Sequence, residues 1–111
     1  MIELPFPPAS LSGHNKGNYH AKSPLVKRWR EMAKEATIAA GIVAPETGDI
    51  RVGVTFYPSS RRGDRVNFPI RMKPIWDGIA DALGVNDSRF LPAFHYAEPV
   101  KQGCVVITVA A

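Results

Sequence analysis

The clearest pattern in the chain is an alternation of apolar and polar positions from residue 50 to residue 57. Apolar side chains stand at every second position from Ile50 to Phe56. Successive side chains of a β-strand point to opposite faces of a sheet, so this spacing predicts a strand with one buried face. A second strand is predicted at residues 104–109, where the run CVVITV is apolar on both faces and indicates a central position in the sheet.

Prolines accompany two weaker strand patterns. Residues 2–4 predict a short strand, which the prolines of the following segment stop. Proline has no N–H to donate to a ladder, so this strand is expected at a sheet edge or to end abruptly. Residues 89–97 predict another strand, and we expect Pro92 to interrupt it for the same reason.

Apolar residues at helical spacing predict a first helix that opens with Ser23 and Pro24. Serine caps helix N-termini, and proline suits the first helical position because its missing N–H would be unpaired there anyway. Gly41 is the predicted C-cap. The predicted core stripe of this helix consists of Leu25, Trp29, Met32 and Ala36.

A second helix is predicted from about Met72 until Gly84 ends it. Pro74 is expected in the first turn, because a proline deeper in a helix costs about 3 kcal/mol or more. Residues 68–71 are expected to form an irregular lead-in. The predicted core stripe consists of Met72, Ile75, Trp76, Ile79 and Leu83.

The predicted elements follow the order β-α-β-α-β-β. This order implies an α+β domain of two layers, in which a mixed β-sheet carries two helices packed on one face. At 111 residues the chain is expected to form one domain, residues 1–111, with one modest core. The apolar fraction of 45% and the charged fraction of 22% are typical of a soluble globular protein, and no apolar run is long enough to predict a membrane span.

Charge and cysteine content bear on the partner and the compartment. The formal net charge of +4 favours an anionic partner. Cys104 is the only cysteine, so no internal disulfide is possible and a reducing compartment is expected. The opening MIELPFPP has neither the basic start nor the long apolar run of a signal peptide. We therefore expect a cytoplasmic protein with an anionic partner and no membrane contact.

Carboxylates gather among basic residues between residues 59 and 91, which hold four of the ten acidic residues. Asp64 follows a predicted strand and Asp87 follows the next predicted helix, so a helix–turn return can bring the two carboxylates together. Hard ions such as Mg²⁺ are held by one or two carboxylates, with substrate phosphates completing the shell. Such an ion would polarise a phosphodiester and activate a water. The alternative is an ordinary helix with a solvated, charged outer face.

Basic and amide side chains are the candidates for contacts to nucleic-acid phosphates. They lie in the loop-like segment 9–22, on the first helix and around Asp64. The alternatives are a polar loop without a ligand and a solvated helix face. The candidates are Lys16, Lys22, Lys27, Arg28, Arg61, Arg62, Arg65, Asn67 and Arg71.

Three short motifs follow one another here: DRVN at residues 64–67, KPIWDGI at residues 73–79 and GVND at residues 84–87. Their order and spacing resemble the RusA family of Holliday-junction endonucleases, in its phage-type form. The family pattern is D-x-D-N, then a lysine followed four residues later by aspartate, then an Asp-Asp pair past the helix. The opening LPFPP, the length and the order of elements are also similar, so the resemblance covers nearly the whole chain.

The resemblance implies a small α+β homodimer that binds branched DNA, four-way junctions above all. It would cut two strands symmetrically with Mg²⁺, for which Mn²⁺ is an expected substitute. By position, Asp64 and Asp87 are the expected catalytic metal ligands, and Lys73 is the expected catalytic contact to the scissile phosphate. Asn67 matches the family asparagine. Asp77 matches the helix aspartate and is expected to be structural, paired with Lys73 one turn away.

Two positions depart from the family pattern. Val66 replaces the second aspartate of D-x-D-N, and Asn86 replaces the first aspartate of the Asp-Asp pair. Valine cannot bind a metal, so metal affinity is expected to fall unless Asp77 or Asp81 supplies the missing charge. Three functions stay open: an active junction endonuclease, a junction-binding protein without catalysis, and a basic or RNA-binding module of unrelated function.

Overall fold

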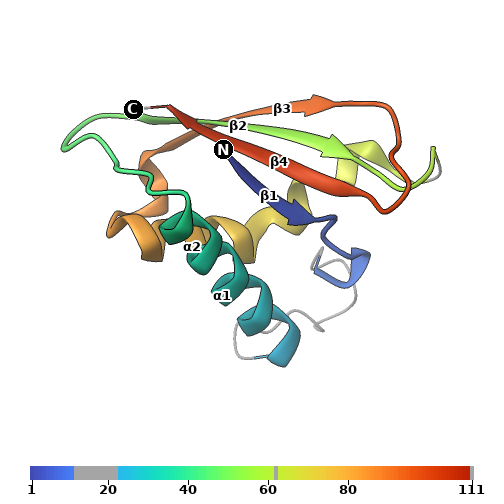
Figure 1. Cartoon of the computed structure of the whole chain (residues 1–111), viewed down its shortest axis with the longest axis horizontal. Coiled ribbons are helices and arrows are strands. Elements are labelled where there is room, and N and C mark those ends of the chain that lie inside the picture. The colour runs from blue at the N-terminus through green and yellow to red at the C-terminus, as the bar shows by residue number, and fades with distance from the viewer. Residues whose placement is uncertain (12–22, 62, 111) are drawn as a thin grey trace.

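The computed structural model of the chain describes residues 1–11, 23–61 and 63–110. A four-stranded sheet forms one layer and two α-helices form the other, both on the same side of the sheet (Figure 1). The predicted α+β architecture, with its order β-α-β-α-β-β, is therefore confirmed. The strands are β1 (Ile2–Pro5), β2 (Ile50–Tyr57), β3 (Phe90–Tyr96) and β4 (Cys104–Ala110), and the helices are α1 (Pro24–Ala39) and α2 (Lys73–Leu83).

The sheet is mixed, with the strand order β1-β4-β2-β3. β2 runs parallel to β3, whereas β4 is antiparallel to both β1 and β2. β4 lies inside the sheet and β1 lies at its edge, as their sequences predict. The alternate residues of β2 from Ile50 to Phe56 are buried, which confirms the predicted pattern of that strand.

The prediction that Pro92 interrupts the strand at residues 89–97 is wrong. β3 runs without a break from Phe90 to Tyr96, and Pro92 stands in register with Val52 of β2. β3 is the edge strand on this side of the sheet. An edge strand has a ladder on one side only, so the missing N–H of a proline is tolerated there.

Helix α1 begins and ends as its sequence predicts, but it buries a different stripe. The Ser23 side chain accepts a hydrogen bond from the backbone N–H of Val26 at 3.1 Å, and Gly41 has a φ of 69° beyond the last turn. The buried residues of α1 are Val26, Trp29, Ala33 and Thr37, whereas Leu25, Met32 and Ala36 are only half-buried. The helix is turned so that its small residue Ala33 faces α2.

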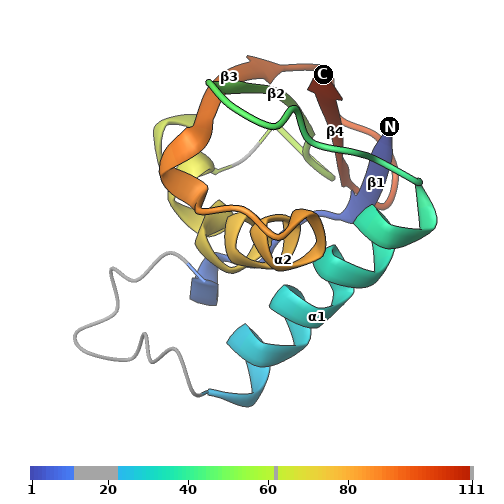
Figure 2. The ribbon, with the colours of Figure 1, turned by 90° about the vertical axis from the view of Figure 1, so that its left-hand side faces the viewer.

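The contact between α1 and α2 depends on Gly78. A Cβ at position 78 would lie 2.2 Å from the carbonyl oxygen of Arg30 and 2.8 Å from the Cβ of Ala33. The two helices therefore approach each other closely at this point, and both are seen packed together in Figure 2. This approach explains why α1 presents Ala33, and not the larger Met32, to its neighbour.

Helix α2 follows the predicted course. Residues 69–72 form a 3₁₀ turn in place of regular helix, and Pro74 stands in the first turn of α2. Gly84 ends the helix with a φ of 67°. Its buried side chains complete the core between the layers, together with those of β2 and β4. Among the described residues, no helix is long and apolar enough to cross a membrane.

Candidate functional site

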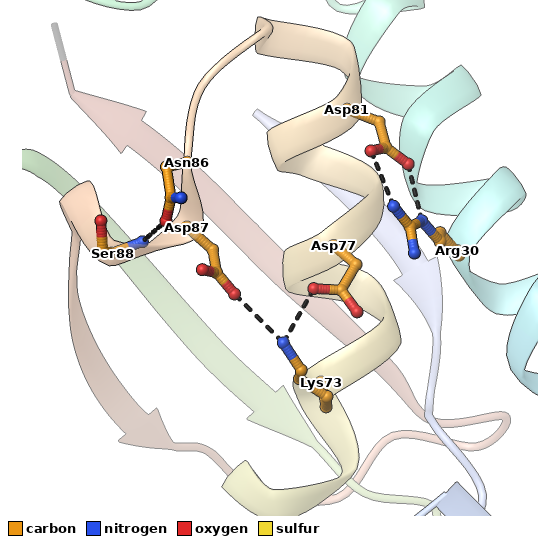
Figure 3. Close-up of polar contacts among 7 residues, drawn as sticks. All are labelled: Arg30, Lys73, Asp77, Asp81, Asn86, Asp87 and Ser88. Atoms are coloured by element: carbon orange, nitrogen blue, oxygen red, sulfur yellow. Dashed lines mark hydrogen bonds and ion pairs between the residues drawn. The ribbon is translucent and has the colours of Figure 1, made fainter. Parts of the chain in front are cut away.

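Lys73 lies between two carboxylates at the beginning of α2 (Figure 3). Its Nζ donates hydrogen bonds to Asp77 Oδ1 at 2.9 Å and to Asp87 Oδ2 at 3.1 Å. Asp77 is one helical turn further along α2, so the predicted pairing with Lys73 is confirmed. Asp87 follows the end of α2, and the turn that contains it brings its carboxylate back beside Lys73. The sequence did not predict this second contact.

A lysine at this position opposes the local helix electrostatics. The N-terminus of a helix carries partial positive charge, which disfavours a cation there, and the first turn of α2 contains no acidic residue. The hydrogen bond to Asp77 is the main cause that raises the pKa of Lys73, and the bond to Asp87 adds to it against the opposing effect of burial. Lys73 is therefore a cation at neutral pH, able to stabilise an anion but not to accept a proton.

The two carboxylates beside Lys73 offer oxygen ligands that are accessible to solvent. The side chain of Asp77 is 23% exposed and that of Asp87 is 40% exposed. Each uses one oxygen to accept a bond from the Lys73 ammonium, and each has a second oxygen that takes no part in that bond. Within the described ranges, no three His, Cys, Asp or Glu residues cluster as a metal site. Two carboxylates nevertheless fit Mg²⁺, which takes one or two from protein and completes its shell with water and substrate phosphates.

Asp81, the other aspartate considered as a replacement ligand, is engaged elsewhere. Its carboxylate accepts a bidentate pair of hydrogen bonds from Arg30 of α1, at 2.7 Å from Nε and 2.9 Å from the second guanidinium nitrogen. The hydrogen bond from Arg30 is the main cause that lowers the pKa of Asp81. Figure 3 shows this pair on the α1 side of α2, away from Lys73. Asp77, and not Asp81, therefore supplies the second negative charge beside Asp87.

Asp64 has a local structural role in addition to any functional one. It caps a 3₁₀ turn at Arg65–Asn67, where its Oδ1 accepts a bond from the Val66 N–H at 3.1 Å. Its Oδ2 accepts a bond from Asn67 Nδ2 at 2.8 Å. The hydrogen bonds of Asp64 thus remain within its own turn, while those of Asp87 lead to α2. The expected proximity of Asp64 to Asp87 stays a prediction.

The two positions that depart from the motifs of the RusA family, Val66 and Asn86, are both at the surface. Val66 is 80% exposed, although valine is an apolar residue. The side-chain oxygen of Asn86 accepts a hydrogen bond from the Ser88 N–H at 2.8 Å and so caps the turn that contains Asp87 (Figure 3). Asn86 therefore positions Asp87 by holding the turn, and an aspartate at position 66 would meet solvent and not the core.

The candidate phosphate contacts fall into two groups. Lys27 and Arg28 are exposed on α1, and Arg61 and Arg65 are exposed in the segment after β2. Arg61 forms an ion pair with Glu98, also at the surface. Three further candidates, Lys16, Lys22 and Arg62, lie outside the described residues. The exposed side chains are accessible to an anionic partner from the helix layer and from the end of β2.

Arg71 has a different environment from the other candidates. Its guanidinium lies 5.7 Å from the ring centre of Phe6 and 5.0 Å from that of Phe68. It also donates a hydrogen bond to the carbonyl of Pro7 at 3.1 Å, and burial lowers its pKa. Arg71 thereby ties the segment after β1 to the 3₁₀ turn before α2. No local pattern predicts this link, because Phe6 and Pro7 are distant from Arg71 in the chain.

No protein family model matches the chain. An uncharacterized protein of Xylella fastidiosa strain Temecula1 is 35% identical to the chain over 113 residues. The match covers 97% of this chain and 74% of the relative. The chain therefore belongs to the same protein family as this Xylella fastidiosa protein.

Proposed function

We propose that the chain is a metal-dependent endonuclease that cuts branched DNA, with four-way junctions as its main substrate. The observation that carries the proposal is the position of Lys73 between Asp77 and Asp87. This arrangement joins a permanent cation to two carboxylates at an accessible surface, which is the chemistry that phosphodiester cleavage requires. The resemblance of DRVN, KPIWDGI and GVND to the RusA family supports the same reaction and the same substrate.

Each residue of this cluster has a distinct role in the proposed reaction. Asp77 and Asp87 would hold Mg²⁺, with Asp64 as a further ligand if its turn lies close to Asp87 as the sequence predicts. When bound, the ion polarises the phosphodiester and lowers the pKa of a water nucleophile. Lys73 places its ammonium against the scissile phosphate and stabilises the charge that develops there. Asn86 positions Asp87 through its hydrogen bond to Ser88.

Exposed basic residues would bind the DNA backbone around the cluster. Lys27, Arg28 and Arg65 are exposed, and the chain carries a net charge of +4. Neutralising phosphates releases counterions, so binding is expected to weaken steeply as salt concentration rises. A four-way junction has approximate two-fold symmetry, and paired cuts need two active sites. The proposed enzyme is therefore a homodimer.

A second candidate function is junction binding without cleavage, and Val66 favours it. This residue stands where a metal-binding aspartate is expected, and its 80% exposure leaves its position open to a ligand. Substitution of an exposed residue away from special features usually changes stability by less than about 0.5 kcal/mol. Val66→Asp is therefore expected to fold normally, which makes it a clean probe of the missing charge.

The experiment is a cleavage assay on a synthetic four-way junction with Mg²⁺ or Mn²⁺, comparing the natural chain with Val66→Asp. Paired symmetric nicks from the natural chain support the endonuclease. Tight binding without nicks, followed by nicks from Val66→Asp, supports the binding protein. Linear duplex or single-stranded RNA bound as tightly as the junction, with no nicks from either chain, contradicts both functions.

A further inference from the structure

The aspartate that completes the candidate site stands in a short turn and not on a long helix or a strand. Asp87 lies in the 3₁₀ turn Asp87–Arg89, between the end of α2 and the beginning of β3. The Ser88 N–H bonds to the Asn86 side chain and the Arg89 N–H to the Asn86 carbonyl, and these bonds define the shape of the turn. They are local, so the place of the Asp87 carboxylate depends on contacts of the turn with other elements.

Arg89 makes such a contact with the connection between α1 and β2, residues 40–49. Its Nη2 donates a hydrogen bond to the Pro45 carbonyl oxygen at 2.6 Å, and its Nε donates one to the Gly48 carbonyl oxygen at 2.9 Å. A planar guanidinium that binds two acceptors is fixed in direction as well as in distance. Figure 1 shows the connection and the turn at the same end of the sheet. Arg89 therefore joins two segments that are distant in the chain.

The bonds of Arg89 lie at a place where the connection is not closely packed. A hollow of about 340 Å³ is lined by residues 42–46 of the connection, by residues 82–85 and by Arg89 itself. Side chains that line a hollow lack part of the contacts that close packing provides. Within the described ranges, no backbone hydrogen bond joins residues 42–48 to residues 84–89. Arg89 therefore supplies the hydrogen bonds between this part of the connection and the turn.

Arg89 anchors the turn without occupying the candidate site. Asp87 accepts the bond from Lys73 through Oδ2, whereas the bonds of Arg89 go to the two carbonyl oxygens of the connection. Among the described side chains, Arg89 forms no ion pair, so it takes neither oxygen of Asp87. Its Nε and Nη2 are engaged within the protein. The guanidinium of Arg89 thus fits a supporting role better than a contact with DNA phosphate.

We propose that Arg89 is a positioning residue, which holds the turn of residues 86–89 against the α1–β2 connection and so keeps the Asp87 carboxylate beside Lys73. The inference rests on the proposed function, in which Asp87 is a metal ligand. Removal of a group that supports a metal ligand from outside the coordination shell typically weakens metal binding about 10-fold to 100-fold. Arg89 acts on Asp87 through the backbone of the turn, so we expect an effect at the lower end of this range.

The first test measures the order of the turn in the chain without metal. NMR relaxation gives backbone order parameters for residues 86–88 in the natural chain, in Arg89→Met and in Arg89→Lys. We expect a fall from about 0.85, typical of a rigid backbone, to below about 0.6 in Arg89→Met. Arg89→Lys keeps the charge but not the planar fork, so we expect a similar fall. Arg30→Met is the matched control, because it removes a guanidinium that donates two hydrogen bonds to Asp81 and none to the turn.

The second test is calorimetric titration of the same proteins with Mn²⁺ in the absence of DNA. We expect Arg89→Met to bind Mn²⁺ about tenfold more weakly than the natural chain, and Arg30→Met to bind it equally well. Circular dichroism and thermal unfolding verify that each variant folds.

Order parameters that are the same in Arg89→Met and the natural chain overturn the proposal, as do values that Arg89→Lys leaves unchanged or that fall equally in Arg30→Met. A Mn²⁺ affinity that Arg89→Met does not lower also overturns it. A natural chain that binds no Mn²⁺ contradicts the proposed metal site instead. The two failures are distinguishable, because the order parameters show without a metal whether Arg89 holds the turn.

Discussion

Lys73 and Asp87 are 14 residues apart in the chain, yet the Lys73 ammonium donates a hydrogen bond to the Asp87 carboxylate across 3.1 Å. Between them α2 runs away from Lys73, and the turn after Gly84 leads the chain back. The side chains of Lys73, Asp77 and Asp87 therefore meet on one side of α2, although Asp87 lies beyond the end of the helix. The other side carries Asp81, which pairs with Arg30. This division assigns the acidic residues of α2 to two separate tasks and leads to the following predictions.

Lys73→Met is expected to slow junction cleavage about 100-fold to 1,000-fold, the usual effect of removing one group that stabilises transition-state charge. Junction binding is expected to change little, because many other basic residues contact the backbone. Cleavage rate and binding affinity are measured separately, by single-turnover kinetics and by gel shift. Lys101→Met, at an exposed turn, is the control. Equal losses of affinity and of rate would show that Lys73 acts as a general DNA contact.

Asp77→Asn and Asp81→Asn form a matched pair one turn apart on α2. Asp77→Asn removes a charge beside Lys73 and Asp87, so we expect weaker Mg²⁺ binding and cleavage slowed about 100-fold or more. Asp81→Asn removes only the pair with Arg30, so we expect cleavage close to that of the natural chain. The Mg²⁺ concentration for half-maximal cleavage is the measurement. If Asp81→Asn has the larger effect, the assignment of the two aspartates is wrong.

The pair between Arg30 and Asp81 is expected to make stability depend on pH. The hydrogen bond from Arg30 lowers the folded-state pKa of Asp81 below its ordinary value of 3.8. The stabilisation is therefore present above the ordinary pKa and is lost as the pH falls through the folded-state pKa. Both side chains are partly exposed, so we expect Asp81→Asn to cost only about 0.5–1 kcal/mol at neutral pH.

Urea unfolding of the natural chain and of Asp81→Asn at neutral pH and at about pH 2 measures this difference. The difference is expected to shrink at the lower pH, because acid protonates the carboxyl first in the unfolded chain and then in the folded chain. High salt at neutral pH is expected to reduce it as well, because exposed charges are screened. A difference that is unchanged by acid and by salt would mean that position 81 acts through packing.

Gly78→Ala is expected to destabilise the fold by about 1–3 kcal/mol. Alanine favours helix over glycine by about 1 kcal/mol, but here its Cβ would lie 2.2 Å from the carbonyl oxygen of Arg30. Ala33→Gly is not expected to rescue the variant, because the nearest obstacle is the backbone of α1. Urea unfolding of Gly78→Ala and of the double variant tests this. A stabilised Gly78→Ala would show that the helices do not approach so closely.

The elements that the sequence predicts well are those with local causes. The alternation in β2 predicts which of its side chains are buried, because one face of the strand packs against the core and the other face is more exposed to solvent. The bounds of α2 follow from Gly84 and from the tolerance of Pro74 in a first turn. The pairing of Lys73 with Asp77 follows from helical spacing alone.

Features that depend on distant contacts were not predictable from local patterns. The buried stripe of α1 differs from the predicted one because Gly78 lets Ala33 approach α2 closely. Gly78 lies 45 residues further along the chain, so no local pattern contains this constraint. Pro92 does not interrupt β3, since the strand order places it at an edge. The contact of Asp87 with Lys73 depends on the path of the turn after α2, which local patterns do not predict. For the same reason, the sequence predicted the pair of Lys73 and Asp77 but not that Asp87 joins it.

The central claim is that the cluster of Lys73, Asp77 and Asp87 cuts branched DNA with the aid of a metal ion. The most direct measurement is single-turnover cleavage of a four-way junction with Mg²⁺, comparing the natural chain with Asp87→Asn and with Asp81→Asn. Asp87 is a cleaner probe than Asp64, which also caps a turn. We predict paired nicks from the natural chain and from Asp81→Asn, and their loss in Asp87→Asn with junction binding retained. Nicks that persist in Asp87→Asn, or that do not require a metal ion, would contradict the account.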